Sequence, residues 1–250
     1  MNEAVPVRPA ATVLLVRDGA SGLEVFMVVR HHKIDFASGA LVFPGGSVDA
    51  GDYAIAADPA LCGPATGLDE RDRASRVAAV RETFEECGVL LARPRGSDEG
   101  LGARIGANSQ ARPFGEFIPA ENLELALDVL TPFAHWITPP ILPKRFDTRF
   151  YIVAAPIDQI AIHDGSESVD SVWINPSRAL AEADAGKYTL VFATRLNLQM
   201  LAQSPDAASA ITAARARRIV TVEPVAVRTE RGYTMRIPIE AGYGGGMFES

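Results

Sequence analysis

One helix-like segment near the middle of the chain strongly limits what the protein can fold into. Residues 71–87, RDRASRVAAVRETFEEC, follow a helical pattern and stop at Gly88, a residue typical of the position just after a helix. Glu82, Glu85 and Glu86 are spaced i, i+3 and i+4, so they share one face of this helix. At an effective dielectric of about 20, two such carboxylates about 5–6 Å apart repel by roughly 3 kcal/mol. The fold must therefore supply positive charge beside this face.

Two explanations of the acidic face are open from the helix alone. In the first, Arg73, Arg76 or Arg81 neutralises an ordinary solvated face. In the second, the clustered carboxylates hold a hard divalent cation such as Mg²⁺ or Mn²⁺, which prefers oxygen ligands and can share them with phosphate. The helix alone does not distinguish these explanations, and the distinction requires evidence from other segments of the chain.

The remaining pattern predicts a chain that contains both strands and helices, separated by loops. A stretch rich in Gly, Pro and Ala, at about 53–72, predicts an irregular insertion before the acidic helix, and residues 93–117 predict a second loop. Residues 227–234 predict a hairpin turn. We expect strands at 11–18, 23–30, 133–138, 145–156 and 169–174, and further helices at 121–130, 176–186 and 190–203.

Composition and charge narrow the classes of ligand and partner. A chain of 250 residues with 48% hydrophobic content can bury a large core, and no sharp change in composition marks a second domain. We expect residues 1–240 to form one domain and 241–250 a flexible tail. The net charge of −7 gives no basic surface for nucleic acid or an anionic membrane, so a phosphate must be met by local Arg, Lys or metal. Two cysteines and a short apolar N-terminal run favour a cytoplasmic protein without disulfides.

The segments on either side of the insertion favour a cation site over an ordinary solvated face. FPGGSVDAGD, residues 43–52, and AAVRETFEECGV, residues 78–89, resemble the signature of the Nudix hydrolases, in which a glycine-rich strand end leads into a helix bearing Arg-Glu, two more glutamates and a glycine. Gly46 matches the first glycine, Asp52 stands at the first glutamate, and Thr83 replaces a bulky aliphatic residue. The remaining matches are Arg81, Glu82, Glu85, Glu86, Gly88 and Val89.

The long spacing inside this signature resembles one Nudix branch, the coenzyme A diphosphatases of peroxisomal type and their bacterial relatives. Three blocks, residues 39–52, 78–92 and 136–153, resemble that branch in the same order, so the resemblance covers most of residues 10–200. A coenzyme A motif of another Nudix branch is half present. Arg30, Gly39 and residues 43–46 fit it, whereas Asp35 occupies its second arginine position.

This resemblance implies a fold, a cofactor and a set of site residues. The fold is the Nudix α/β/α sandwich, an α/β architecture with a mixed sheet and loop or helical insertions. Mg²⁺ or Mn²⁺ is expected on Glu82, Glu85, Glu86 and the carbonyl of Gly46, with Arg81 orienting a glutamate. A further catalytic carboxylate is expected from a distant loop, with Glu167 as the candidate and Asp164 and Asp170 as alternatives. The substrate-binding candidates are Arg30, Lys33, Phe43, Arg145 and Arg149, and Lys144 is a further local cation.

The implied reaction is hydrolysis of the diphosphate of coenzyme A or acyl-coenzyme A, which yields adenosine 3′,5′-bisphosphate and phosphopantetheine or its acyl form. One alternative is a Nudix diphosphatase for another nucleoside diphosphate derivative, such as ADP-ribose or a dinucleotide. The other is a Nudix-fold binding module without turnover. The expected partner is the small-molecule diphosphate itself, and the insertion and the glycine-rich tail could serve a homodimer.

Overall fold

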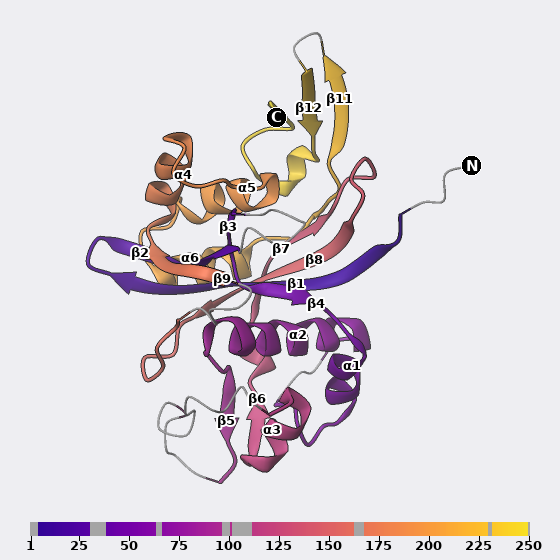
Figure 1. Cartoon of the computed structure of the whole chain (residues 1–250), viewed down its shortest axis with the longest axis vertical. Coiled ribbons are helices and arrows are strands. Elements are labelled where there is room, and N and C mark those ends of the chain that lie inside the picture. The colour runs from indigo at the N-terminus through magenta and orange to yellow at the C-terminus, as the bar shows by residue number, and fades with distance from the viewer. Residues whose placement is uncertain are drawn as a thin grey trace.

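The computed structural model describes residues 5–30, 39–63, 67–96, 101, 112–162, 168–229 and 232–249. A mixed sheet forms its centre, with the strand order β10-β7-β8-β1-β2-β3, while β4 pairs with β1 and β9 with β2. Helices cover both faces of this sheet, so the expected α/β/α sandwich is confirmed (Figure 1). The strands are β1 Val7–Gly19, β2 Gly22–Arg30, β3 Leu41–Val42, β4 Gly45–Ser47, β7 Thr131–Ile137, β8 Arg145–Ala154, β9 Ser168–Ile174 and β10 Thr221–Val222.

The long central strand β1 explains why the sheet is covered on both sides. It pairs with β8 in parallel and with β2 and β4 in antiparallel fashion. Val13 and Leu15 face the cluster that includes α2, Glu70–Cys87. Leu14 and Val16 face the cluster that includes α5, Phe192–Leu201, and α6, Ala207–Ala216. All four side chains are buried, as expected for a strand with a hydrophobic layer on each face.

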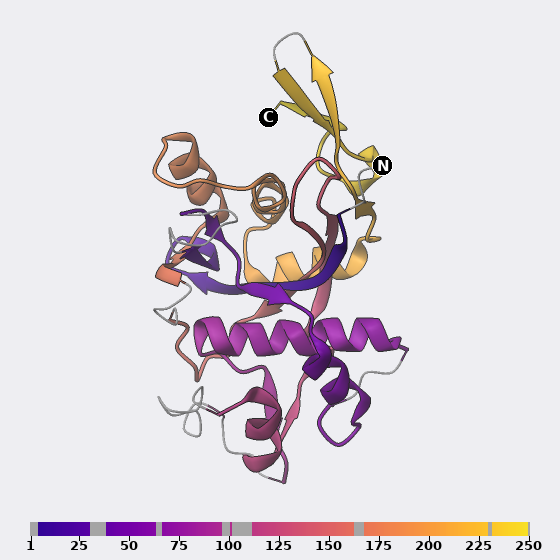
Figure 2. The ribbon, with the colours of Figure 1, turned by 45° about the vertical axis from the view of Figure 1, so that its right-hand side comes forward.

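The helices divide between these two faces (Figure 2). One face carries α2 with α1, Ala50–Ala57, and α3, Phe114–Ala120. The other carries α4, Pro176–Asp184, α5, Phe192–Leu201, and α6, Ala207–Ala216. None of the described helices has the length and apolar character that crossing a bilayer requires.

The acidic helix α2 begins and ends close to the predicted positions. The side chain of Asp69 caps its first turn by accepting a hydrogen bond from the Asp72 N–H. It ends at Gly88, which has the left-handed backbone angle of φ 70°, so the predicted stop is confirmed. Val77, Val80 and Phe84 are among its buried residues, and they fix this helix on the sheet.

The prediction of an irregular insertion was wrong for its first part. Ala50–Ala57 form helix α1, which packs against α2. Asp49 and Asp52 make a capping box at its start, and Ile55 is buried. The sequence pattern missed this helix because eight mostly small residues carry a weak amphipathic signal.

Two further local predictions were wrong. The helix expected at 121–130 is instead strand β6, Leu123–Leu125, followed by the short 3-10 helix η3, Leu127–Val129, and β6 pairs with β5, Ala92–Pro94. Leu123 and Leu125 are buried in alternation around Glu124, which is the period of a strand rather than of a helix. Helix α3 begins inside the segment that was expected to be a loop, at Phe114, and continues beyond its end to Ala120.

The C-terminal segment contains more regular structure than the sequence pattern indicated. The expected hairpin is present as β11, Val225–Thr229, and β12, Gly232–Arg236. Within residues 241–250, which were expected to form a tail, β13, Met247–Glu249, pairs with β12 to complete a three-stranded sheet. The short 3-10 helix η4, Ile239–Ala241, precedes Tyr243, whose hydroxyl donates a hydrogen bond to Asn197 Oδ1 at 2.7 Å. The C-terminal sheet is thereby attached to α5.

Candidate active site

Two adjacent glycines bring strand β4 against the acidic face of α2. The N–H of Gly45 donates to Glu86 Oε2 at 2.9 Å. Gly45 has φ 153°, and a Cβ there would meet the carbonyl oxygen of Ala11 at 2.3 Å. A Cβ on Gly46 would meet the carboxylate of Glu82 at 2.4 to 2.6 Å. Both positions therefore require glycine, the first for the sheet and the second for the approach of Glu82.

Arg81 is the cation that compensates the carboxylates in this arrangement. Its Nε and Nη2 donate to the two oxygens of Asp52 at 2.8 and 2.9 Å. Its Nη1 donates to Glu82 Oε1 at 2.8 Å and to Glu85 Oε2 at 2.9 Å. The expected orienting role of Arg81 thus has a geometric basis. Asp52 is fully buried and anchors Arg81 from the first turn of α1.

Arg76, which was also considered for neutralising the acidic face of α2, has a different structural role. It is buried, and its Nη1 donates to the carbonyl oxygens of Leu127 and Leu130. Burial lowers the pKa of Arg76 below its ordinary value. This side chain therefore secures the η3 turn rather than the acidic face.

The environment of Glu82 differs from that of the other glutamates. Burial raises the pKa of the Glu82 carboxyl to about 7, although the neighbouring Arg81 acts in the opposite direction. Burial also lowers the pKa of Arg81, but its hydrogen bond to Asp52 and the nearby carboxylates outweigh this and raise the pKa above its ordinary value. Arg81 stays charged, whereas the Glu82 carboxyl ionises at a higher pH than an ordinary glutamate.

The donor set suits a hard divalent cation. Three carboxylates, from Glu82, Glu85 and Glu86, lie on consecutive turns of α2, and the backbone of Gly46 lies against the first of them. Oxygen donors of this kind are those that Mg²⁺ prefers. In the described part of the chain, no three carboxylate, imidazole or thiol groups converge as a ready-made metal site. Because Arg81 bonds Glu82 and Glu85, a bound cation would compete with it for these two carboxylates.

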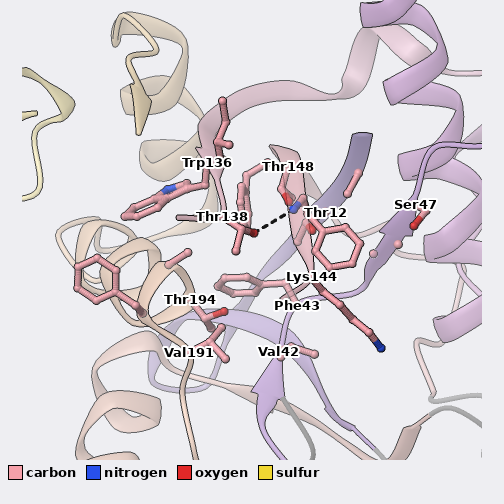
Figure 3. A pocket seen from close by; sticks show the side chains of 18 of the residues that line it. Thr12, Val42, Phe43, Ser47, Trp136, Thr138, Lys144, Thr148, Val191 and Thr194 are labelled. Carbon is pink, nitrogen blue, oxygen red and sulfur yellow. Dashed lines mark hydrogen bonds between the residues drawn. The ribbon is translucent and has the colours of Figure 1, made fainter. Parts of the chain in front are cut away.

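A large cavity begins at this carboxylate end and extends beneath α5. Its volume is about 790 Å³, and Figure 3 shows side chains from several strands and from the start of α5 directed into it. Gly46, Ser47 and Glu82 line one part, and the cations Arg30 and Lys144 also line it. Its aromatic lining consists of Phe43, Trp136, Phe146, Phe150 and Phe192.

The predicted substrate-binding residues do not all reach this cavity. Arg30 and Phe43 line it, but Arg145 and Arg149 do not. The alternation of β8 directs its even-numbered residues, such as Phe146, into the cavity and its odd-numbered residues elsewhere. Arg145 pairs with Glu223 at 2.5 Å, and Arg149 pairs with Asp72 of α2. In this structure both arginines therefore join structural elements and lie outside the cavity lining.

Only one of the candidates for the distant catalytic carboxylate lies within the described residues. Lys33, Asp164 and Glu167 lie outside the described residues. Asp170 is exposed on β9, and one of its carboxylate oxygens accepts a hydrogen bond from the Ser171 N–H at 2.8 Å. Asp170 does not line the cavity.

The structure adds cavity residues that the sequence pattern did not single out. Thr194 and Phe192 come from the start of α5, while Pro224 and Met235 come from the C-terminal segment. Trp136 is packed against Phe192 with ring centres 5.8 Å apart, and its indole N–H donates to the Tyr243 hydroxyl at 3.0 Å. Helical periodicity can place a helix at 190–203, but it cannot show that the first turn faces a cavity.

Comparisons with known proteins agree with this geometry. The model of the NUDT19 Nudix domain matches residues 65–191, about half of the chain. A putative nudix hydrolase 7 of Caenorhabditis elegans is 30% identical over 207 residues, covering 80% of this chain and 62% of the relative. The human acyl-coenzyme A diphosphatase NUDT19 is 28% identical over 207 residues, covering 64% of this chain and 55% of the relative. The chain thus spans less than two thirds of the length of these curated relatives.

A solved structure extends the similarity over more of the chain. The crystal structure of a NUDIX hydrolase from Alicyclobacillus acidocaldarius is similar with a TM-score of 0.72 at 29% sequence identity. The similarity covers 83% of this chain and 96% of that one. The fold is therefore shared across the greater part of both chains.

Proposed function

The chain belongs to the Nudix hydrolase family, and we propose that it is a metal-dependent diphosphatase of coenzyme A or acyl-coenzyme A. Water attacks one phosphorus of the diphosphate, and the bridging P–O bond breaks. The products are adenosine 3′,5′-bisphosphate and phosphopantetheine or acyl-phosphopantetheine. The acyl-coenzyme A diphosphatases NUDT19 of frog and human, which this chain resembles at 24% and 28% identity, support this choice of substrate.

One observation carries the proposal, namely the half-buried Glu82 held against Gly46 where α2 meets a 790 Å³ cavity. Glu82, Glu85 and Glu86 would hold Mg²⁺ or Mn²⁺, and the carbonyl of Gly46 would contribute a further oxygen. A bound cation would neutralise the diphosphate oxygens and lower the pKa of a water molecule. The Gly45 N–H would keep Glu86 oriented, while Arg81 would limit the movement of Glu82 and Glu85.

The shape of the cavity supports a substrate larger than a simple diphosphate. Its volume lies within the range of about 300–1,000 Å³ that is usual for sites of small organic ligands. Carboxylates lie at one end, and aromatic rings such as Phe43 and Trp136 offer surfaces for stacking. Arg30 and Lys144 would bring local positive charge for phosphate, which the net charge of −7 does not provide. Glu167 is retained in the proposal as the distant catalytic carboxylate.

A hydrolysis panel tests the proposed function. The full chain would be incubated with coenzyme A, an acyl-coenzyme A, ADP-ribose and a dinucleotide, each with Mg²⁺ and with EDTA, and the products separated by chromatography. We expect Mg²⁺-dependent release of adenosine 3′,5′-bisphosphate from the first two compounds with the highest kcat/KM. Faster cleavage of ADP-ribose or the dinucleotide would favour another Nudix diphosphatase activity. Binding of these compounds without any turnover would favour the non-catalytic module.

A further inference from the structure

The first turn of α5 faces the cavity without a capping side chain. Helix α5 spans ten residues, and its N-cap, Val191, makes no side-chain hydrogen bond to the turn. Val191, Phe192, Ala193 and Thr194 all line the cavity. The backbone N–H groups at the start of a helix have no partner within the helix, and the helix dipole adds partial positive charge there. This end of α5 therefore has the properties of an anion-binding turn.

Thr194 provides a second and independent indication of a ligand. Its residue surface is only 5% exposed, yet it lines the cavity, and Figure 3 shows its hydroxyl oxygen directed toward the cavity. Among the described residues, this hydroxyl makes no hydrogen bond, and it is not enclosed by protein atoms but opens to the cavity. It is therefore available to a ligand acceptor bound in the cavity.

Arg30 brings a full positive charge to the same cavity. Its backbone N–H donates to the carbonyl of Ala40 at 3.1 Å, and Ala40 forms a β-bridge with Thr189, just before α5. This bridge joins the end of β2 to the segment that leads into α5. The Nε of Arg30 is buried and has no hydrogen-bond partner among the described residues. A guanidinium donor with no partner thus lines the same cavity as the uncapped turn.

We propose that the first turn of α5, with Thr194 and Arg30, binds a phosphomonoester of the substrate that is separate from the diphosphate cleaved beside Glu82. The hydrogen-bond donors of this subsite are the backbone N–H groups, a hydroxyl and a guanidinium. Their number suits the three terminal oxygens of a phosphate better than the two oxygens of a carboxylate ligand. The aromatic side chain of Phe192 helps to exclude water, which strengthens such contacts. This inference rests on the proposed function and assigns the subsite that selects substrates with an additional phosphate.

The primary test compares coenzyme A with 3′-dephospho-coenzyme A. For the wild type, we expect kcat/KM to be about tenfold or more in favour of coenzyme A. Thr194→Val removes the hydroxyl with little change in volume, and it should lower this preference about five- to tenfold through the KM of coenzyme A alone. Thr148→Val is the matched control, because it removes a hydroxyl from another wall of the cavity, on β8, and should leave the preference at the wild-type value.

A second variant separates a role in ligand binding from a role in folding. Ala193→Asp places a carboxylate in the first turn of α5, where it favours the helix but repels a phosphate. We expect an unchanged or higher melting temperature together with loss of the preference for coenzyme A. The inference is overturned if the wild type shows no preference, or if Thr194→Val and Ala193→Asp both retain it.

A binding measurement keeps this result distinct from failure of the proposed function. If the wild type cleaves neither compound, the proposed activity fails, and calorimetry with adenosine 3′,5′-bisphosphate and with adenosine 5′-monophosphate then tests the subsite alone. Tighter binding of the bisphosphate, lost in Thr194→Val and in Ala193→Asp, would still support the subsite. Equal affinity of the wild type for the two nucleotides would overturn it.

Discussion

Replacement of Glu82 by Gln is expected to change how the stability of the protein depends on pH. Burial raises the pKa of Glu82 from 4.5 to about 7, so the folded protein retains a proton that the unfolded chain has lost. The free energy of unfolding should therefore fall as the pH rises from about 4.5 to 7 and level off above that range. Glu82→Gln removes this contribution because Gln cannot ionise.

The magnitude follows from the two pKa values. Their separation corresponds to a ceiling of about 3 kcal/mol, and the side chain is only 15% exposed, which limits solvent screening. Urea unfolding in EDTA at several pH values between 5 and 8 would measure the free energy of unfolding of the wild type and of Glu82→Gln. As the pH rises across this range, we expect the stability of Glu82→Gln relative to the wild type to increase by up to about 3 kcal/mol. At pH 8, Mg²⁺ should stabilise the wild type more than the variant.

Glu85→Gln is the matched control for this experiment. Glu85 lies one turn from Glu82 on the same helix and also bonds Arg81, but its side chain is 45% exposed. The wild-type pH dependence should largely persist in this variant. Parallel stability curves for the wild type and Glu82→Gln between pH 5 and 8 would refute the assignment of the pH dependence to the half-buried Glu82.

Two further predictions concern the residues that hold the carboxylates in place. Asp52→Asn should lower the free energy of unfolding by about 3 kcal/mol in urea titrations, because it breaks a buried ion pair with Arg81; a loss below about 0.5 kcal/mol would show that Asp52 does not anchor Arg81. Gly46→Ala should retain the melting temperature but lose about a hundredfold in Mg²⁺-dependent turnover, because its Cβ displaces only the carboxylate of Glu82. Gly45→Ala should instead lower stability by about 2 kcal/mol, because its Cβ meets the backbone of β1, and equal behaviour of the two variants would contradict this distinction.

Local patterns predicted those parts of the molecule in which local spacing determines the structure. The strands β1, β2 and β8, the helix α2 and its end at Gly88 follow from apolar periodicity and from the backbone freedom of glycine. The resemblance to the Nudix signature placed Gly46 beside the glutamates, as the structure finds. The short helix α1 and the strand pair β5–β6 were missed, because their stability comes from packing against α2 and from each other.

The assignment of individual charges required the three-dimensional structure. Arg145 and Arg149 are close in sequence to Phe146, but the alternation of β8 separates them from the cavity that Phe146 lines. The role of Asp52 was also hidden, because its partner Arg81 lies on another helix, beyond the insertion. Thr194 became a candidate only when its burial and its position in the cavity were known.

The most direct test of the account is the turnover of coenzyme A by the wild type, Glu85→Gln and Glu86→Gln, with Mg²⁺ and with EDTA. Melting temperatures measured in parallel would show that each variant is folded. The account predicts that the wild type releases adenosine 3′,5′-bisphosphate only with Mg²⁺, and that each variant loses several orders of magnitude in turnover while remaining folded. Near-normal turnover by either variant in Mg²⁺, or wild-type turnover that persists in EDTA, would contradict a cation held by the acidic face of α2.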